Sequence, residues 1–235
     1  MKEENYIKEK GLLNQPKAIS AREIIYLGNI IKTYICKIKC NNGSNGTGFF
    51  CNISNDWNNT LKVLMTNNHV LNEKDIQPGQ TINFSINNEG QNYSILIDNR
   101  RKIYTNESYD VTFIEIKKED LIDEKSFFDL DKQIFQINAN EIFRNSQIFL
   151  LHYPKGIEME ISPGVIINIR EDNKTIYHLC DTSGGSSGGP IINKTNFQII
   201  GIHKGGAEGA RNYNLGTLLK EPVEKFIEEI NLKKK

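Results

Sequence analysis

Apolar residues in this chain recur mostly at every second position, in short runs that turn residues separate. A two-residue period is typical of β-strands that bury one face. The period predicts twelve strands, at residues 33–40, 46–53, 61–66, 81–86, 93–97, 111–116, 147–151, 158–169, 175–178, 190–192, 198–203 and 213–218. Many short strands separated by turns favour a β-sandwich or a β-barrel.

The apolar residues take helical spacing only near the two ends of the chain. Residues 21–31 predict a short helix, and a second helix is predicted where apolar residues recur at i, i+3, i+4 and i+7, namely Val223, Phe226, Ile227 and Ile230. A polar, irregular segment divides the strands into two groups. We therefore predict a flexible arm at 1–22, a first β unit at 23–120, a linker at 121–144, a second β unit at 145–220, and a helix with a lysine tail at 221–235.

The charges of the chain balance, with 29 Lys and Arg residues against 29 Asp and Glu residues. This balance argues against a protein that binds nucleic acid by neutralising phosphates, because such proteins carry a basic surplus. No apolar run approaches the ~20 residues of a membrane span, and residues 1–5 do not begin a signal peptide. We therefore expect no nucleic-acid partner, no membrane partner and a cytoplasmic location.

Cysteine usage agrees with a reducing compartment. Three of the four cysteines lie within alternating apolar runs, which favours buried free thiols over a disulfide or a metal site. The four are Cys36, Cys40, Cys51 and Cys180. No cluster of carboxylates or histidines has metal-ligand spacing, and no phosphate-binding glycine loop occurs. We expect neither a metal nor a cofactor.

The most informative stretch is a Gly/Ser loop at 181–190, between two predicted strands. Its four glycines permit positive φ angles, so that backbone N–H groups can point outward from the loop. Two such N–H groups that converge form an oxyanion hole, and a serine between them becomes a nucleophile when a base lies beside it. Taken alone, the loop is also typical of a flexible Gly/Ser hairpin.

Two residues upstream complete a candidate catalytic set. His69 follows a predicted strand, within Thr-Asn-Asn-His at 66–69, and Asp110 precedes another, within Tyr-Asp-Val-Thr at 109–112. A half-buried carboxylate can hold the imidazole of a general base in one tautomer. The order His, Asp, Ser is one of the known orders of the catalytic triad.

These motifs resemble those of the trypsin-like (chymotrypsin-fold) serine peptidases, together with Gly-Thr-Gly-Phe-Phe at 46–50, Gly-Ser-Ser-Gly-Gly-Pro at 185–190 and Gly-Ile-His-Lys-Gly-Gly at 201–206. Over about residues 33–220 the chain is most similar to the branch with the bacterial glutamyl endopeptidases and the HtrA-type proteases. The resemblance implies an all-β fold of two packed six-stranded antiparallel β-barrels, with the active site between them and the C-terminal helix after them.

The same resemblance implies the role of each site residue. His69 is the general base, Asp110 orients it, and Ser187 is the nucleophile. The backbone N–H groups of Gly185 and Ser187 form the oxyanion hole. Ser186 stands where trypsins have the aspartate that pairs with a newly cut N-terminus, so activation through that ion pair is not expected.

Residues that resemble substrate-binding positions favour two different substrates. Thr182 and His203 stand where glutamyl endopeptidases keep a Thr and a His that bind a Glu or Gln side chain before the scissile bond. Asp181 stands where trypsin keeps the acid that selects Arg or Lys. Asp181 would repel a substrate carboxylate unless it turned away or paired with Lys204 or Arg211. We favour Glu or Gln, with a basic residue as the alternative.

The sequence therefore predicts a serine endopeptidase that cleaves a peptide or protein substrate through an acyl-enzyme at Ser187. The alternative is a catalytically silent pseudo-protease that binds peptides. The other histidines, His152 and His178, are predicted to lie in the core or at the barrel rim, and Trp57 in a hairpin loop. The sequence leaves the physiological substrate and the oligomeric state open.

Overall fold

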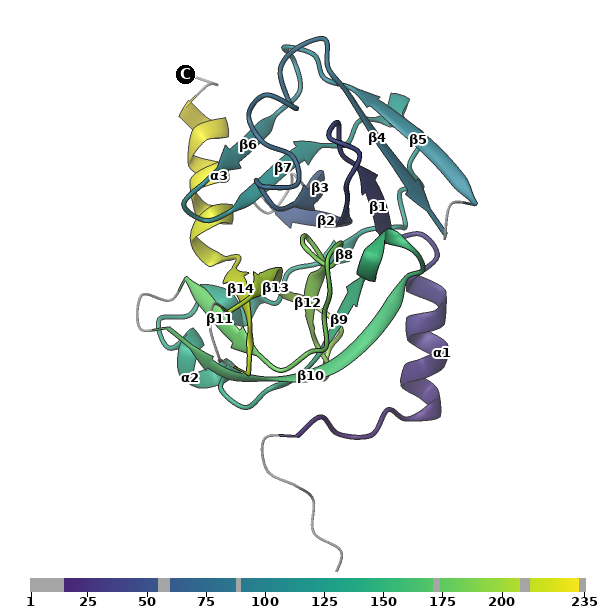
Figure 1. Cartoon of the computed structure of the whole chain (residues 1–235). Helices are drawn as coiled ribbons and strands as arrows, with labels where there is room; N and C mark the ends of the chain where they lie inside the picture. Colours follow the sequence, from purple (N-terminus) through teal and green to yellow (C-terminus); the bar gives the residue numbers. More distant parts are fainter. Residues whose placement is uncertain (1–14, 55–59, 88–89, 171–173, 208–211, 233–235) are drawn as a thin grey trace, which may run out of the picture.

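The computed structural model describes residues 15–54, 60–87, 90–170, 174–207 and 212–232. Two β units lie against each other, the first in the upper half of Figure 1 and the second in the lower half, with a helix along the side of each. The predicted pair of β units followed by a C-terminal helix is therefore confirmed. The predicted position of Trp57 and the lysine tail at 233–235 lie outside the described residues.

The first unit is a sheet of eight strands, and it differs from the predicted closed barrel of six. Seven antiparallel strands follow the order β5-β4-β1-β2-β3-β7-β6, and β8 pairs with β2 in parallel. In the described part of the chain, no hydrogen-bonded ladder joins the edge strands β5 and β6. The strands are β1 (Ile35–Lys39), β2 (Asn45–Ser54), β3 (Thr60–Thr66), β4 (Thr81–Ile86), β5 (Gln91–Leu96), β6 (Ile103–Asn106), β7 (Val111–Glu115) and β8 (Phe128–Asp129).

Both faces of the central strands of this sheet are buried. In β2, Phe49 and Cys51 join a core shared with the second unit, while Phe50 joins a separate core inside the first unit. In β3, Met65 and Leu64 divide between the same two cores. Successive side chains of a strand point to opposite faces, so these strands need apolar residues at odd and at even positions.

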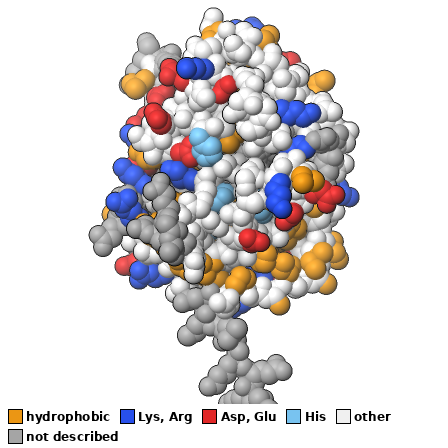
Figure 2. Space-filling view, viewed as in Figure 1, with side chains coloured by type: hydrophobic (Ala, Val, Ile, Leu, Met, Phe, Trp, Pro, Cys, Tyr) orange, Lys and Arg blue, Asp and Glu red, His pale blue; other side chains and the backbone are white. Residues whose placement is uncertain are grey.

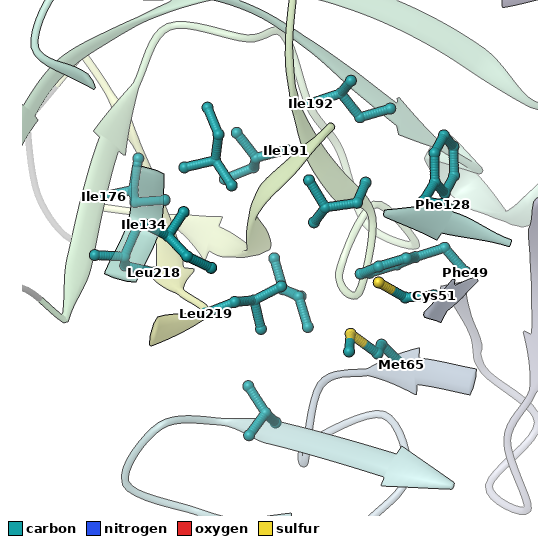
Figure 3. Close-up of a cluster of buried hydrophobic side chains, with 14 of the residues drawn as sticks. Phe49, Cys51, Met65, Phe128, Ile134, Ile176, Ile191, Ile192, Leu218 and Leu219 are labelled. Atoms are coloured by element: carbon teal, nitrogen blue, oxygen red, sulfur yellow. The ribbon is translucent and has the colours of Figure 1, made fainter. Parts of the chain in front are cut away.

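The second unit is a closed barrel of six strands in the order β10-β11-β14-β13-β12-β9, as predicted. The strands are β9 (Gln147–His152), β10 (Glu160–Ile169), β11 (Thr175–His178), β12 (Pro190–Asn193), β13 (Ile199–Gly206) and β14 (Asn214–Leu218). Figure 3 shows how Ile191 and Leu219 of this unit share one apolar cluster with Phe49 and Met65 of the first. The two units are therefore joined by a continuous core.

The segment at 121–144 is packed more tightly than a plain linker. It contains β8, a 3₁₀-helix (Lys132–Phe135) and the short helix α2 (Ala139–Phe143). Ile134 and Phe143 are buried in the shared core. Asp131 accepts hydrogen bonds from the side chains of Asn193 and Asn196, at 2.9 and 3.0 Å. These contacts fix the segment against the second barrel.

The first helix, α1 (Ala21–Ile30), begins at a capping box formed by Ser20 and Glu23 and packs on the second unit. Tyr26 lies 4.2 Å from Phe197 between ring centroids, and Glu23 pairs with Lys194 at 3.5 Å. The predicted flexible arm differs from the structure over 15–22. The backbone N–H of Lys17 donates to the side chain of Gln147 at 2.7 Å, and the helix has already begun at Ala21.

The last helix, α3 (Lys220–Leu232), follows the second unit in sequence but packs on the first (Figure 1). Phe226 lies 5.9 Å from Tyr104 and 5.7 Å from Phe113 between ring centroids. The hydroxyl group of Tyr109 donates to the carboxylate of Glu221 at 2.6 Å. Each terminal helix is thus fastened to the β unit that is more distant in sequence.

Candidate active site

His69 and Asp110 are in direct contact, as the motifs predict. His69 lies in the turn after β3 and Asp110 immediately before β7, and these two strands pair with Thr66 opposite Thr112. The imidazole Nδ1 of His69 lies 3.0 and 2.9 Å from the two carboxylate oxygens of Asp110. The backbone N–H of His69 donates to Oδ1 of Asp110 at 3.0 Å. One carboxylate therefore fixes both the ring and the backbone of His69.

The position of Asp110 depends on a local turn that its neighbours stabilise. Asp110 has a φ of 55°, in the left-handed region that Asp tolerates better than most residues. Its backbone N–H donates to the carbonyl of Glu107 at 3.0 Å, and its own carbonyl accepts from the side chain of Asn67 at 2.8 Å. This turn directs the carboxylate toward His69, which keeps half of its side chain exposed. Figure 2 shows histidine side chains at the surface near the middle of the face, where the two units meet.

The Gly/Ser loop is held against the first unit through the backbone of Thr47. The N–H of Thr47 donates to the carbonyl of Ser187 at 2.8 Å. Gly188 has a φ of 89°, and a Cβ at this position would overlap the carbonyl oxygen of Thr47. Only glycine therefore permits the loop to approach β2 so closely.

The two backbone N–H groups that are predicted to form an oxyanion hole belong to Gly185 and Ser187. The carbonyl of Gly184 accepts from the N–H of Lys155, and the carbonyl of Ser186 accepts from the N–H of Gly189 at 3.1 Å. A trans peptide directs its N–H opposite to its carbonyl, so these two bonds also orient the N–H groups of Gly185 and Ser187. Neither of these two N–H groups donates a hydrogen bond within the described ranges.

The side chain of Ser187 does not contact His69 in this structure. Its hydroxyl group donates instead to the carbonyl oxygen of Lys204 at 3.1 Å. No hydrogen bond joins Ser187 to His69 among the described residues. The structure thus brings His69 and Asp110 together and leaves the Ser187 hydroxyl in a rotamer that points to β13.

The model of the trypsin-like peptidase domain matches residues 46–202, a span that contains His69, Asp110 and Ser187. This chain belongs to the family of trypsin-like peptidases. The match confirms the predicted serine peptidase class, whereas the glutamyl endopeptidase or HtrA-type branch stays a prediction. A search of curated protein sequences gave no match to this trypsin-like peptidase.

Solved structures of proteases share the fold of this trypsin-like peptidase. It aligns with the serine endoprotease of Yersinia pestis at a TM-score of 0.61 and 14% identity, over 90% of this chain and 68% of the other. It aligns with the active form of the Rv3671c protease of M. tuberculosis at a TM-score of 0.60 and 16% identity, over 93% and 91%. For the inactive form of that protease the TM-score is 0.61 at 15% identity, over 92% and 98%.

His203 is buried inside the second barrel of this trypsin-like peptidase, next to His178. Nδ1 of His203 lies 3.1 Å from Nε2 of His178, and the backbone N–H of Cys180 donates to Nδ1 of His178 at 3.3 Å. Burial lowers the pKa of both histidines, that of His178 to about 4, and repulsion by His152 on His178 and by His178 on His203 acts in the same direction. Both rings are therefore neutral at pH 7.

The hydrogen-bond order assigns a tautomer to each of these rings. Because Nδ1 of His178 accepts from a backbone N–H, its proton lies on Nε2 and is donated to Nδ1 of His203. The proton of His203 then lies on Nε2, and the backbone of Leu215 also interacts with this ring. His203 is thus a hydrogen-bond donor through Nε2–H.

Asp181 and Thr182 line one pocket together, and Asp181 also borders a second pocket with His178. Both border a pocket of about 340 Å³, together with His152, Lys155 and Glu160. Asp181 is exposed and, among the described residues, forms no ion pair with Lys204, while Arg211 lies outside them. The structure therefore brings Asp181 and Thr182 together and shows no contact between either of them and His203.

His152 lies directly behind the Gly/Ser loop, and the sequence did not indicate this. It was predicted as a core or rim residue, and it is indeed buried, but Nδ1 also lies 2.7 Å from the hydroxyl oxygen of Ser186. Burial lowers the pKa of His152 to about 4, although the charge of Asp181 opposes this shift. No group of three or more His, Cys, Asp and Glu residues in the described ranges is arranged to hold a metal ion. No helix in these ranges is long and apolar enough to cross a membrane.

Proposed function

We propose that this trypsin-like peptidase is a serine endopeptidase whose triad is His69, Asp110 and Ser187. The observation that carries the proposal is the contact of His69 Nδ1 with both oxygens of Asp110, at 3.0 and 2.9 Å. An ionised carboxylate there requires the Nδ1 proton, so Nε2 of His69 keeps a lone pair and can act as a base.

In the first half of the reaction, Ser187 Oγ attacks the carbonyl carbon of the scissile bond, and its proton passes to Nε2 of His69. The negative charge that develops on the carbonyl oxygen is bound by the N–H groups of Gly185 and Ser187, which have no other acceptor in the described ranges. The imidazolium then gives its proton to the leaving amine as the C–N bond breaks. Water, deprotonated by His69, hydrolyses the resulting ester and regenerates Ser187.

Before it can attack, Ser187 has to turn away from Lys204. A rotation about its Cα–Cβ bond breaks the 3.1 Å hydrogen bond to the Lys204 carbonyl and can bring Oγ toward His69. Exchange of one hydrogen bond for another changes the free energy little, because a neutral pair contributes on the order of 1 kcal/mol. Such a rotamer change is fast compared with peptide hydrolysis.

We further propose a preference for Glu or Gln before the scissile bond. Nε2 of His203 carries the proton when His178 donates to Nδ1, so His203 can donate a hydrogen bond to a substrate side chain. Asp181 argues for the opposite charge, but it is exposed and borders the pocket of His152. A basic side chain at this position of the substrate is the alternative.

One observation favours a second candidate function, a pseudo-protease that binds peptides without hydrolysing them. The hydroxyl group of Ser187 is bound to Lys204 and not to His69. If that rotamer were the only accessible one, the base could not remove the proton and the cleft would only bind peptides.

Labelling with a fluorophosphonate probe distinguishes the two functions, because the probe reacts only with an activated serine. We expect one adduct, on Ser187, in the folded protein and none in Ser187→Ala. Ser85→Ala is a matched control, since Ser85 is a buried serine of β4 whose hydroxyl has no partner in the described part of the chain. If the probe does not react with the folded wild-type protein but the protein binds peptides, the endopeptidase function is excluded and the pseudo-protease function is supported.

A further inference from the structure

The Gly/Ser loop is held by two buried side chains that come from outside it, Thr47 and His152. They hold neighbouring residues, Gly185 and Ser186, which precede the nucleophile Ser187 directly. Neither side chain carries a charge at neutral pH. Hydrogen bonds from neutral groups therefore fix the loop. Ser186 has no carboxylate, so the loop cannot use the ion pair that trypsins form at this position.

Thr47 reaches the loop from β2 of the first unit. Its side chain is fully buried, and Oγ1 donates to the carbonyl of Gly185 at 2.8 Å. The same oxygen accepts from the backbone N–H of Tyr153 at 3.0 Å. One hydroxyl group thus ties together the first unit, the loop and the end of β9.

His152 holds the loop from the opposite side, within the second barrel. The hydroxyl oxygen of Ser186 accepts from the N–H of Ser183 at 3.1 Å, so its own proton needs another acceptor. Nδ1 of His152, at 2.7 Å, is the only one among the described residues. Both side chains of this pair are buried, which removes water as a competitor for the bond.

These two contacts determine how the N–H groups of the oxyanion hole are oriented. The carbonyl of Gly185 belongs to the peptide between the two that carry the N–H groups of Gly185 and Ser187. Ser186 joins that middle peptide to the peptide of the Ser187 N–H. A shift of either anchor would rotate these peptides, and a displacement of about 1 Å in a catalytic group can cost a factor of about 100 in rate.

We propose that Thr47 and His152 are positioning residues that hold the oxyanion loop in its reactive conformation. The proposal rests on the proposed function, because it gives these residues a role in the same hydrolysis. It assigns one hydrogen bond to each residue, Thr47 Oγ1 to the Gly185 carbonyl and His152 Nδ1 to the Ser186 hydroxyl.

Paired substitutions test each hydrogen bond separately from side-chain volume. Thr47→Val keeps the shape and loses the hydroxyl group, whereas Thr47→Ser keeps the hydroxyl group. His152→Asn keeps an acceptor where Nδ1 lies, whereas His152→Gln has its amide where Nε2 lies. We expect kcat to fall on the order of 100-fold in Thr47→Val and His152→Gln, with KM nearly unchanged. Thr47→Ser and His152→Asn should recover most of the loss.

A transition-state analogue adds a readout that a loss of stability would not move. A peptide boronate forms a tetrahedral adduct with Ser187 and so reports on the oxyanion hole. Its affinity should fall in parallel with kcat in Thr47→Val and His152→Gln, while both variants remain folded at the assay temperature. If Thr47→Val does not fold, kcat and boronate affinity are compared between His152→Gln and His152→Asn instead. Values of kcat within threefold of wild type in folded Thr47→Val and His152→Gln would overturn the proposal.

The His152 bond can also be observed without any catalysis. In the ¹⁵N NMR spectrum of the imidazole, His152 should have a proton on Nε2 and an accepting lone pair on Nδ1, and Ser186→Ala should shift the Nδ1 resonance. If the wild-type enzyme hydrolyses no peptide but this pattern is found, the proposed function fails and the hydrogen bond stands. If the enzyme is active and the proton lies on Nδ1, the positioning proposal alone is wrong.

Discussion

The hydroxyl group of Ser187 donates to the carbonyl oxygen of Lys204 at 3.1 Å, although Ser187 belongs to the same predicted triad as His69. Lys204 lies where the register between β13 and β14 shifts, between His203 and Gly205. Such a bulge leaves a residue outside the regular ladder, so its carbonyl can accept a side-chain hydrogen bond. In a complex with a bound peptide, we expect a crystal structure to show Ser187 Oγ within about 3.2 Å of His69 Nε2. A retained Lys204 contact in that complex would contradict the proposed triad.

Asp110→Asn should abolish most activity and leave the fold intact. An asparagine can still accept from the backbone N–H of His69, but it presents an N–H to Nδ1 and favours the tautomer without a lone pair on Nε2. We expect kcat to fall by about 10⁴, the loss that this exchange causes in a well-studied serine protease. Steady-state kinetics and the melting temperature check this together. A decrease of less than tenfold would show that Asp110 does not orient the base.

Substrate preference should depend on the donor N–H of His203. In a peptide library varied before the scissile bond, we expect faster cleavage after Glu or Gln than after Lys. His203→Gln retains an N–H donor near the position of Nε2 and should keep part of the preference, whereas His203→Leu should lose it. Asp181→Asn should raise cleavage after Glu by a few-fold, because it removes a like charge. Equal cleavage after Glu and Lys in the wild type would contradict the assignment of His203.

The buried histidines predict a loss of stability in mild acid. The pKa values of His152 and His178 are lowered by burial to about 4, and burial also lowers that of His203 well below the ordinary 6.5. Between pH 6.5 and 4 the unfolded chain therefore binds more protons than the folded protein, so the free energy of unfolding decreases as the pH falls. Each group contributes a slope of up to about 1.4 kcal/mol per pH unit.

Urea unfolding across this pH range checks the prediction. His152→Asn removes one of the three groups, so its stability should depend less steeply on pH than that of the wild type. Asp181, Lys155, Glu158 and Glu160 border the pocket of His152 and are unchanged in this variant. A free energy of unfolding that stays constant between pH 6.5 and 4 would show that the histidines are not buried in the neutral form.

Loss of either Arg101 or Asp120 alone should destabilise the first unit more than half as much as loss of both. Both side chains are almost fully buried, and the guanidinium group makes two bonds to the carboxylate, at 2.7 and 3.0 Å. Removal of one partner leaves a buried charge without its counterion, which costs about 3–5 kcal/mol. We expect that loss in Arg101→Met and in Asp120→Leu, measured by urea unfolding, and a smaller loss in the double variant than the sum. Additive losses would mean that the two charges do not interact.

The periodic parts of the fold are predicted well from the sequence, and the short or non-periodic parts are not. The helix at 21–31, predicted from the spacing of its apolar residues, corresponds to α1, and the structure adds the capping box of Ser20 and Glu23. Strands β6 and β8 were not predicted, because β8 has only two residues and β6, with the sequence Ile-Tyr-Thr-Asn, does not alternate between apolar and polar residues. Whether the first unit closes as a barrel depends on the pairing of its edge strands, which no local pattern encodes.

In the candidate site too, residues in a sequence motif could be predicted, and contacts that depend on tertiary structure could not. His69, Asp110 and Ser187 lie in recognisable motifs, and the structure brings the first two together. The contacts of Thr47 and His152 to the loop join residues 138 and 34 positions apart. Thr47 lies in the Gly-Thr-Gly-Phe-Phe motif, which does not indicate this contact, and His152 has no sequence signal besides its type. A threonine in a strand and a histidine at the end of one are ordinary β residues until the tertiary structure places an acceptor beside them.

Because each terminal helix packs on the β unit of the other half of the chain, the two halves depend on each other for folding. α1 is fastened to the second β unit and α3 to the first, and the apolar core continues between the units. Proteolysis within 121–144 would therefore yield two fragments. The N-terminal fragment would contain α1, which packs on the C-terminal fragment, and the C-terminal fragment would contain α3, which packs on the N-terminal one. Such fragments should remain associated after cleavage and recombine when they are produced separately, while neither should fold alone. The two β units are halves of one cooperative structure rather than independent modules.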